Sequence, residues 1–271
     1  MNNAELYQKN NSLQKRDAVD ALKEYAAKIR WKKYGDRVID IGCGDGGITI
    51  NVLKKYMPNN FERLVGCDIS ENMVNFANIH HGNERTHFTT LDIEGYLPIT
   101  LKNNFDHAFS FYVLHWIKHQ EVAFTNIYDM LNKGGDCLLV FIGYHPIYEA
   151  YRTLARNNKW SSWLHDVDRF ISPYHDSKDS EKEIKKMMEE IGFSNIEVSS
   201  KQKFFIYNSP ETLKKAVQAV NPFKIPFDVF NDYFNDYMEA FRDMIQLKEE
   251  NNNELDIIKF SYNLITVYGT K

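Results

Sequence analysis

Short apolar runs alternate with segments of helical spacing along the first 142 residues. Apolar residues recur at steps of three and four over residues 12–31, which predicts an amphipathic helix. Buried strands are predicted from five runs: residues 38–41, 63–70, 88–94, 105–117, and the end of 131–140, after a glycine turn. Because strands that alternate with helices form parallel, doubly wound sheets, this half predicts a Rossmann-like α/β core.

The second half of the chain adds two strands and two unusual insertions. A helix is expected over residues 180–191 and a strand over 194–207. The last strand, over 256–269, alternates apolar and polar residues and is expected to be antiparallel at one end of the sheet. The fold class is therefore α/β, with a mostly parallel seven-stranded sheet. Two aromatic-rich helical segments, residues 145–176 and 208–247, exceed the short connections that such a fold needs and predict a helical cap.

A length of 271 residues suits a single α/β domain, residues 1–271, with insertions. Its parts are expected to be N-terminal lid helices, a Rossmann core, two cap insertions, and the remainder of the core sheet. In that order they span residues 1–34; 35–143; 144–178 and 208–250; and 179–207 and 251–271. In open α/β sheets, ligands bind beyond the carboxyl ends of the strands, so the lid and cap would enclose a second ligand.

Composition narrows the class of partner. The net charge of −4 offers no general attraction to nucleic acid, whose binding depends on neutralising phosphates, so no nucleic-acid partner is expected. Cys43, Cys67 and Cys137 lie near the ends of predicted strands, and their odd count and spacing indicate neither a disulfide framework nor a metal site. The chain shows no apolar signal core and no run of about 18 apolar residues, so we expect a cytoplasmic protein without stable membrane insertion.

The glycine cluster after the first strand carries the strongest chemical signal. Gly42 and Gly44 follow the strand directly, and a helix-like segment begins a few residues later, the geometry by which a Rossmann sheet approaches a nucleotide. Asp40 stands two residues before Gly42, where a pyrophosphate would be repelled and an ammonium group attracted. This combination favours S-adenosylmethionine, which has an amino-acid end and no phosphate.

Later segments offer partners for the rest of that cofactor. Asp68 ends the second strand and can accept both ribose hydroxyls, whereas Asp92 and Ile93 end the third strand and suit the adenine. Cys43, Ile69 and Ser110 are further expected contacts. Gly42, Gly44 and Gly47 also form a literal G-x-G-x-x-G, which a nicotinamide-dependent enzyme would share. Taken in order and at these spacings, the five segments resemble the class I S-adenosylmethionine-dependent methyltransferases.

The acceptor side is indicated by three residues near the expected methyl group. Gln14 lies on the N-terminal helix, and His115 and Trp116 lie at the end of the fourth strand. An amide and an indole N–H are neutral donors that suit a carboxylate, which is already ionised at pH 7 and needs neither base nor metal. Trp116 could equally be a core residue and Gln14 an exposed one, and His115 could shape the pocket or act as a base. No metal ligand set is evident.

A closer resemblance covers essentially the whole chain. Segments such as NNAELYQKNNSLQKRDA, YRTLARNNKWSSWLHDVDRFISPYHD and VNPFKIP resemble the insect juvenile hormone acid O-methyltransferases. The resemblance implies methylation of juvenile hormone acid or farnesoic acid, with Gln14 and Trp116 holding the carboxylate as catalytic residues. Gly44 departs from the family, where alanine is common. The alternatives are a methyltransferase for another small or fatty acid, such as trans-aconitate, and a paralogue of low activity.

A sesquiterpenoid acid would bury its apolar tail among the aromatic residues of the insertions, about half of which are expected to contact it. The expected substrate contacts, besides Gln14, His115 and Trp116, are Tyr112, Tyr148, Tyr151, Trp160, Trp163, Tyr174 and Phe223, with Phe170 and Phe227 in the same pool. These rings could instead be the core of the cap. A monomer or a homodimer is expected.

Overall fold

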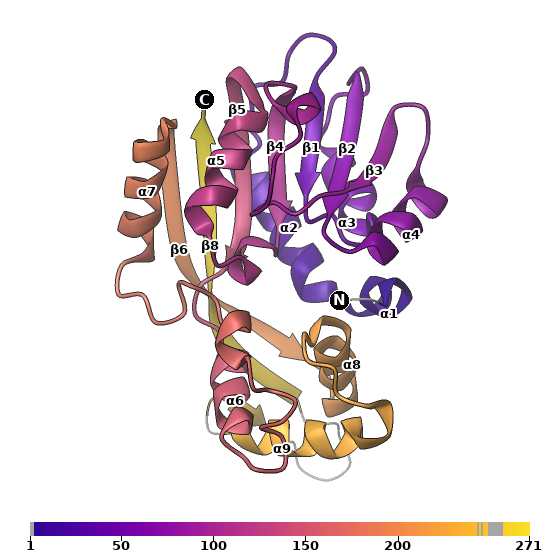
Figure 1. The fold of residues 1–271 in the computed structure, drawn as a ribbon, viewed down its shortest axis with the longest axis vertical. Coiled ribbons are helices and arrows are strands. Elements are labelled where there is room, and N and C mark those ends of the chain that lie inside the picture. The colour runs from indigo at the N-terminus through magenta and orange to yellow at the C-terminus, as the bar shows by residue number, and fades with distance from the viewer. Residues whose placement is uncertain (1–2, 243, 245, 249–256) are drawn as a thin grey trace.

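A single mixed sheet organises the protein (Figure 1). The computed structural model describes residues 3–242, 244, 246–248 and 257–271. The strands run in the order β3-β2-β1-β4-β5-β8-β6, and β7 pairs with β8. The strands are β1 (Arg37–Ile41), β2 (Arg63–Asp68), β3 (Thr86–Thr90), β4 (Phe105–Phe111), β5 (Leu131–Ile142), β6 (Ser194–Tyr207), β7 (Gln246–Lys248) and β8 (Ile257–Thr270).

The predicted fold class is confirmed. Strands β1 to β5 pair in parallel, and β8 is antiparallel to both β5 and β6. The last strand does not lie at the edge, however, because β6 pairs along its outer side. The short strand β7 falls within the insertion that was expected to be helical. The predicted boundary at residues 250 and 251 lies outside the described residues.

Helices cover both faces of the sheet. They are α1 (Ala4–Asn10), α2 (Ser12–Tyr25), α3 (Gly47–Asn51), α4 (Glu71–His81), α5 (Gln120–Met130), α6 (Pro146–Ala155), α7 (Ser180–Ile191), α8 (Pro210–Val220) and α9 (Phe230–Arg242). The helix predicted over residues 12–31 is wrong beyond Tyr25. Past that point the backbone N–H groups of Arg30 and Lys32 donate to the side chains of Asp136 and Asp36.

Alternating side chains of the strands separate two apolar clusters. In β1, Val38 belongs to one cluster, while Ile39 and Ile41 belong to the other on the opposite face. The first cluster also contains the buried aromatic residues of the cap, such as Tyr151 and Tyr237. The core therefore continues from one face of the sheet into the cap, which makes the cap part of the folded domain.

The far halves of β6 and β8 extend beyond the parallel strands and meet α6, α8 and α9 (Figure 1). The helix α1 lies between this cap and the core and contacts both α8 and α4, whereas α2 packs against β5 of the sheet. The two predicted insertions are thus brought together in space. In the described part of the chain, no helix combines the length and hydrophobicity needed to cross a membrane.

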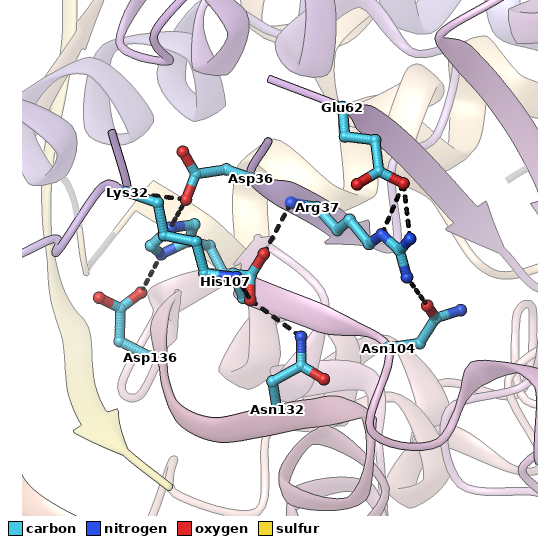
Figure 2. Close-up of polar contacts among 9 residues, drawn as sticks. Lys32, Asp36, Arg37, Glu62, Asn104, His107, Asn132 and Asp136 are labelled. Atoms are coloured by element: carbon cyan, nitrogen blue, oxygen red, sulfur yellow. Dashed lines mark hydrogen bonds and ion pairs between the residues drawn. The ribbon is translucent and has the colours of Figure 1, made fainter. Parts of the chain in front are cut away.

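A polar network closes the opposite, amino-terminal end of the sheet (Figure 2). The buried imidazole of His107 lies 2.7 Å from Asp136 Oδ1 and 3.0 Å from Asp36 Oδ1. The backbone N–H of Arg37 donates to Asp106, which also accepts from Lys32 Nζ at 2.5 Å. These bonds fix the linker between α2 and β1 to the starts of β1, β4 and β5.

Candidate active site

Two adjoining cavities lie at the carboxyl ends of the parallel strands. The larger, of about 260 Å³, is lined by residues that follow β1, β2, β3 and β4. The smaller, of about 70 Å³, lies between the core and the cap helices. Tyr7, Tyr112, Trp116 and Val220 line both. A ligand in one cavity would therefore meet a ligand in the other at these side chains.

The glycine turn forms one wall of the larger cavity. Gly42 has a φ of +72°, and a Cβ added there would lie 1.9 Å from Val113, so no other residue fits without rearrangement. The N–H groups of Gly42 and Cys43 both donate to the carbonyl of Cys67, at 2.6 and 2.9 Å. The turn is thereby tied to β2 and presents bare backbone to the cavity.

Asp68 stands at the end of β2 with its carboxylate fixed by the backbone. Its Oδ2 accepts from Gly44 N at 3.0 Å and its Oδ1 from Ser70 N at 2.9 Å. Burial raises the pKa of this carboxyl, against the effect of those two hydrogen bonds. Each oxygen keeps a further lone pair, so the group can accept from a diol. Ile69, Asp92 and Ile93 continue the same wall.

These residues fit the predicted cofactor in kind. The carboxylate of Asp68 is fixed and suits a ribose, and the neighbouring Asp92 and Ile93 suit a purine. The glycines of the turn have no side chain and would let a ligand lie close to the backbone. Residues Gly42, Gly44, Asp68, Ile69, Asp92 and Ile93, all predicted cofactor contacts, line the larger cavity.

The other three predicted cofactor contacts, Asp40, Cys43 and Ser110, do not line the cavity. Asp40 accepts from Thr49 Oγ1 at 2.5 Å, and burial raises its pKa to about 7. Ser110 donates to the carbonyl of Ile41 at 2.9 Å, and the thiol of Cys43 is buried, which raises its pKa. Direct contact of these groups with a cofactor stays a prediction.

In the smaller cavity, Gln14, His115 and Trp116 come together, with Tyr112 and Tyr148 beside them. Within the described residues, neither the Gln14 amide nor the Trp116 indole hydrogen-bonds to another group of the protein, and both line the cavity. Burial, with a smaller effect from the neighbouring His145, lowers the pKa of His115 to about 3. The imidazole is therefore neutral at pH 7. The structure thus groups neutral N–H donors at the junction of the cavities.

Half of the predicted cap aromatics pack inside the cap and line neither cavity. Trp160 donates its indole N–H to Asp236 at 2.7 Å, and Tyr174 donates to Gln120 at 3.1 Å. The rings of Tyr151 and Phe223 stack edge to face at 5.0 Å. Trp163 packs against Trp160, and Phe227 is 85% exposed. Of the eight predicted rings in the two insertions, Tyr148 and Phe170 line a cavity. Four of the others belong to the apolar cluster that the cap shares with the sheet, whereas Tyr174 packs in the cluster on the opposite face of the sheet.

Several lining residues were not singled out from the sequence. They are Tyr7, His145, Tyr207, Tyr237, Phe241 and Phe260. Tyr237 and Phe241 are four residues apart on α9, a spacing that places both on one face and could have identified them. Tyr7 carries no comparable signal, because its place over the glycine turn depends on how α1 folds back.

One group of side chains resembles a metal site. Within the described ranges, Glu149, His175 and Asp176 could jointly hold an ion. Arg152 already bonds to Glu149 at 2.9 Å and to Asp176 at 3.1 Å, so a cation occupies the position. None of these residues lines either cavity.

Comparison with known proteins identifies the class. The family described as "Methyltransferase domain" matches residues 7–198. Among solved structures, YcgJ from Bacillus subtilis has a TM-score of 0.58 at 19% identity, covering 93% of this chain and 98% of its own. Phosphoethanolamine N-methyltransferase 2 from Haemonchus contortus has a TM-score of 0.56 at 17% identity, covering 94% and 53%. Fold and domain match together define a methyltransferase with a Rossmann-like core, which excludes the nicotinamide-dependent alternative.

Two curated relatives narrow this class. The juvenile hormone acid O-methyltransferase of Bombyx mori is 59% identical over 273 residues, covering 100% of this chain and 98% of its own length. The enzyme of the same name from Drosophila melanogaster is 38% identical over 277 residues, covering 100% and 93%. The chain belongs to the juvenile hormone acid O-methyltransferase family, as the sequence segments predicted.

Proposed function

We propose that this enzyme methylates the carboxylate of a sesquiterpenoid acid, juvenile hormone acid or farnesoic acid, with S-adenosylmethionine as methyl donor. The observation that carries the proposal is the junction of the two cavities. There, the Gln14 amide and the Trp116 indole are free to donate, next to a wall that suits the cofactor. Family membership supports the same reaction, because both curated relatives carry it in their names.

The cofactor is expected in the larger cavity, with its ribose on Asp68 and its adenine beside Asp92 and Ile93. Bound there, the cofactor would supply the methyl group of its sulfonium, which the acceptor carboxylate takes by in-line displacement of the demethylated cofactor. The acceptor carboxylate is ionised at pH 7, so the protein need not remove a proton. Its task is to orient an oxygen and exclude water, which supplies most of the rate in such reactions.

Gln14 and Trp116 would orient that oxygen by donating to the carboxylate. His115, being neutral, could add a third donor or shape the pocket, but its low pKa makes it a weak base. The substrate tail would lie along the apolar wall formed by Tyr148, Leu213 and Val217. Removing such a tail from water gains about 25 cal/mol per Å² before the costs of binding.

The smaller cavity argues against a small polyacid such as trans-aconitate. A substrate with three carboxylates would need several cations, whereas the described lining contains no Lys or Arg. Its second histidine, His145, is also neutral, because burial lowers its pKa to about 3. We further propose that the enzyme works in the cytoplasm as a monomer or homodimer without nucleic acid, which agrees with its three free, buried cysteines.

The first test is methyl transfer from labelled cofactor to a panel of acids. Farnesoic acid and juvenile hormone acid should be methylated with the highest kcat/KM, saturated fatty acids less well, and trans-aconitate hardly at all. A preference for trans-aconitate would refute the sesquiterpenoid assignment. Weak turnover of every acid, with normal cofactor binding, would identify a paralogue of low activity.

The second test is Gln14→Ala. We expect kcat to fall by about 100-fold, because misplacing a reacting atom by ~1 Å has an effect of that order. Affinity for the demethylated cofactor, measured by calorimetry, should be unchanged, because Gln14 does not line the larger cavity. Gln218→Ala on α8, which lines neither cavity, is the control. Normal turnover in Gln14→Ala would move the carboxylate site elsewhere, with His115 the next candidate.

A further inference from the structure

One buried carboxylate beside the site has no part in the proposed chemistry. The side chain of Asp17, on α2, is fully buried. Its Oδ2 accepts hydrogen bonds from the hydroxyls of Tyr112, at 2.6 Å, and Tyr262. Its Oδ1 lies 2.9 Å from the Arg16 guanidinium and 2.7 Å from Lys203 Nζ. A buried charge with this many partners is fixed in place.

These bonds join four separate elements. Asp17 and Arg16 belong to α2, Tyr112 follows the end of β4, Tyr262 lies in β8 and Lys203 in β6. Sequence separations of 95 and 245 residues divide Asp17 from the two tyrosines. The carboxylate therefore holds the N-terminal helix against the site end of the sheet.

Tyr112 needs such support. Its φ is +64°, a region that side-chain-bearing residues adopt rarely and only where the surroundings enforce it. Its backbone N–H donates to the carbonyl of Val140 at 2.7 Å, and its hydroxyl donates to Asp17. Both ends of the residue are thus held, and its ring lines both cavities.

The position of Gln14 depends on the same set of bonds around Asp17, which we call the Asp17 tie. It precedes Asp17 by three residues on α2, so the two side chains lie on neighbouring positions of one helix face. Any rotation or shift of α2 that breaks the bonds of Asp17 would move the Gln14 amide relative to Tyr112 and Trp116.

We propose that Asp17 is a positioning residue for methyl transfer. It touches neither cavity, and it acts by fixing Gln14 and Tyr112 in one arrangement across the cavity junction. The kinetic consequences of this inference rest on the proposed function. The effect of the Asp17 tie on the stability of α2 and of the segment around Tyr112 can be measured without a substrate.

The kinetic experiment compares Asp17→Asn with Asp20→Asn. Asparagine keeps the shape of Asp17 but loses the charge that Arg16 and Lys203 neutralise. On farnesoic acid, kcat should fall by about 10- to 100-fold, because misplacing a reacting atom by ~1 Å costs about 100-fold. Affinity for the demethylated cofactor should stay within about twofold. Asp20 lies on the same helix and also pairs with Lys203, at 2.7 Å, but is half exposed, so Asp20→Asn should behave as wild type.

A double variant distinguishes positioning from general support of the fold. Tyr112→Phe removes one donor of the tie and keeps the ring. If Asp17 acts through Tyr112, Asp17→Asn should add little to the loss of kcat in Tyr112→Phe, because contacting residues of one network are not additive. If the fold-losses of kcat in the two single variants multiply in the double variant, the inference is overturned. If Asp17→Asn does not fold, Tyr262→Phe, which also removes one donor, takes its place in the same cycle.

Hydrogen exchange tests the tie without relying on substrate identity. With demethylated cofactor bound, Asp17→Asn should exchange faster than wild type in residues 12–25 and 111–116, and Asp20→Asn should not. If wild-type enzyme methylates no sesquiterpenoid acid while this difference is present, the proposed function alone fails. Unchanged exchange in Asp17→Asn, or unchanged kcat in a folded variant, would overturn the role of Asp17.

Discussion

Asp40 and Asp68 are neighbouring acids with different environments. Asp68 ends β2 on the cavity wall, with two backbone N–H groups on its oxygens. Asp40 lies under the turn with one hydrogen bond, from Thr49, and burial outweighs that bond to raise its pKa to about 7. A carboxyl with a pKa of about 7 changes its charge near neutral pH, so Asp40 can respond to small changes in pH.

This difference predicts the pH dependence of cofactor binding. If the cofactor's ammonium group lies near Asp40, it favours the ionised carboxyl and lowers the pKa of Asp40 from about 7. Affinity should then increase as the pH rises from 5.5 to about 7, and binding should release protons at the lower pH. Calorimetry in buffers of different ionisation enthalpy measures that release. Asp40→Asn should abolish it, and a wild-type affinity independent of pH would exclude Asp40 from the ammonium site.

At the level of elements, the His107 network fastens the linker after α2 to the sheet (Figure 2). Burial disfavours the charged imidazole, but the hydrogen bonds and charges of Asp136 and Asp36 outweigh burial and raise the pKa of His107. A raised pKa in the folded state means that the charged form stabilises the fold. This stabilisation is complete below the unfolded value of about 6.5 and is lost as the pH rises through the folded pKa.

His107→Gln should therefore destabilise the protein most at low pH. Loss of one partner from a buried charge network costs about 3–5 kcal/mol, and we expect a loss in this range at pH 6. The difference in Tm from wild type should shrink at higher pH. His87→Gln on β3, an exposed histidine, is the control. A gap in Tm that does not change between pH 5.5 and 8.5 would show that folding leaves the pKa of His107 unshifted, and a gap that grows with pH would show that the buried imidazole is neutral.

The order of the elements was predictable from the sequence because each strand of the core is a short apolar run with a polar end. The glycine turn and Asp68 were predictable for the same reason, since strand ends fix their location. The cap could not be resolved in this way. Trp160 and Tyr148 are both aromatic residues of the first insertion, and nothing in the sequence separates their roles. In the structure, Trp160 donates to Asp236 inside the cap and Tyr148 lines the smaller cavity. Which of them faces the ligand depends on contacts between residues far apart in the chain.

At the scale of the whole molecule, core and cap share one apolar cluster, and the smaller cavity lies where they meet. The cap therefore contributes to the stability of the fold and, under the proposed function, would also select the substrate. A change to the cavity wall should affect the substrate in proportion to the length of its tail, whereas a change on the outer surface of the same helix should not.

Ala216→Phe on α8 tests this division, because Ala216 is buried and lines the smaller cavity. If the new ring displaces about 60 Å² of tail contact, the loss is about 1.5 kcal/mol at 25 cal/mol per Å². That corresponds to a roughly tenfold lower kcat/KM for farnesoic acid. Acids short enough to avoid the ring should be methylated as before. Lys215→Phe, an exposed neighbour, controls for an added ring on α8, and Tm measurements control for overpacking. Equal losses for long and short acids in a stably folded Ala216→Phe would show that the tail does not occupy this cavity.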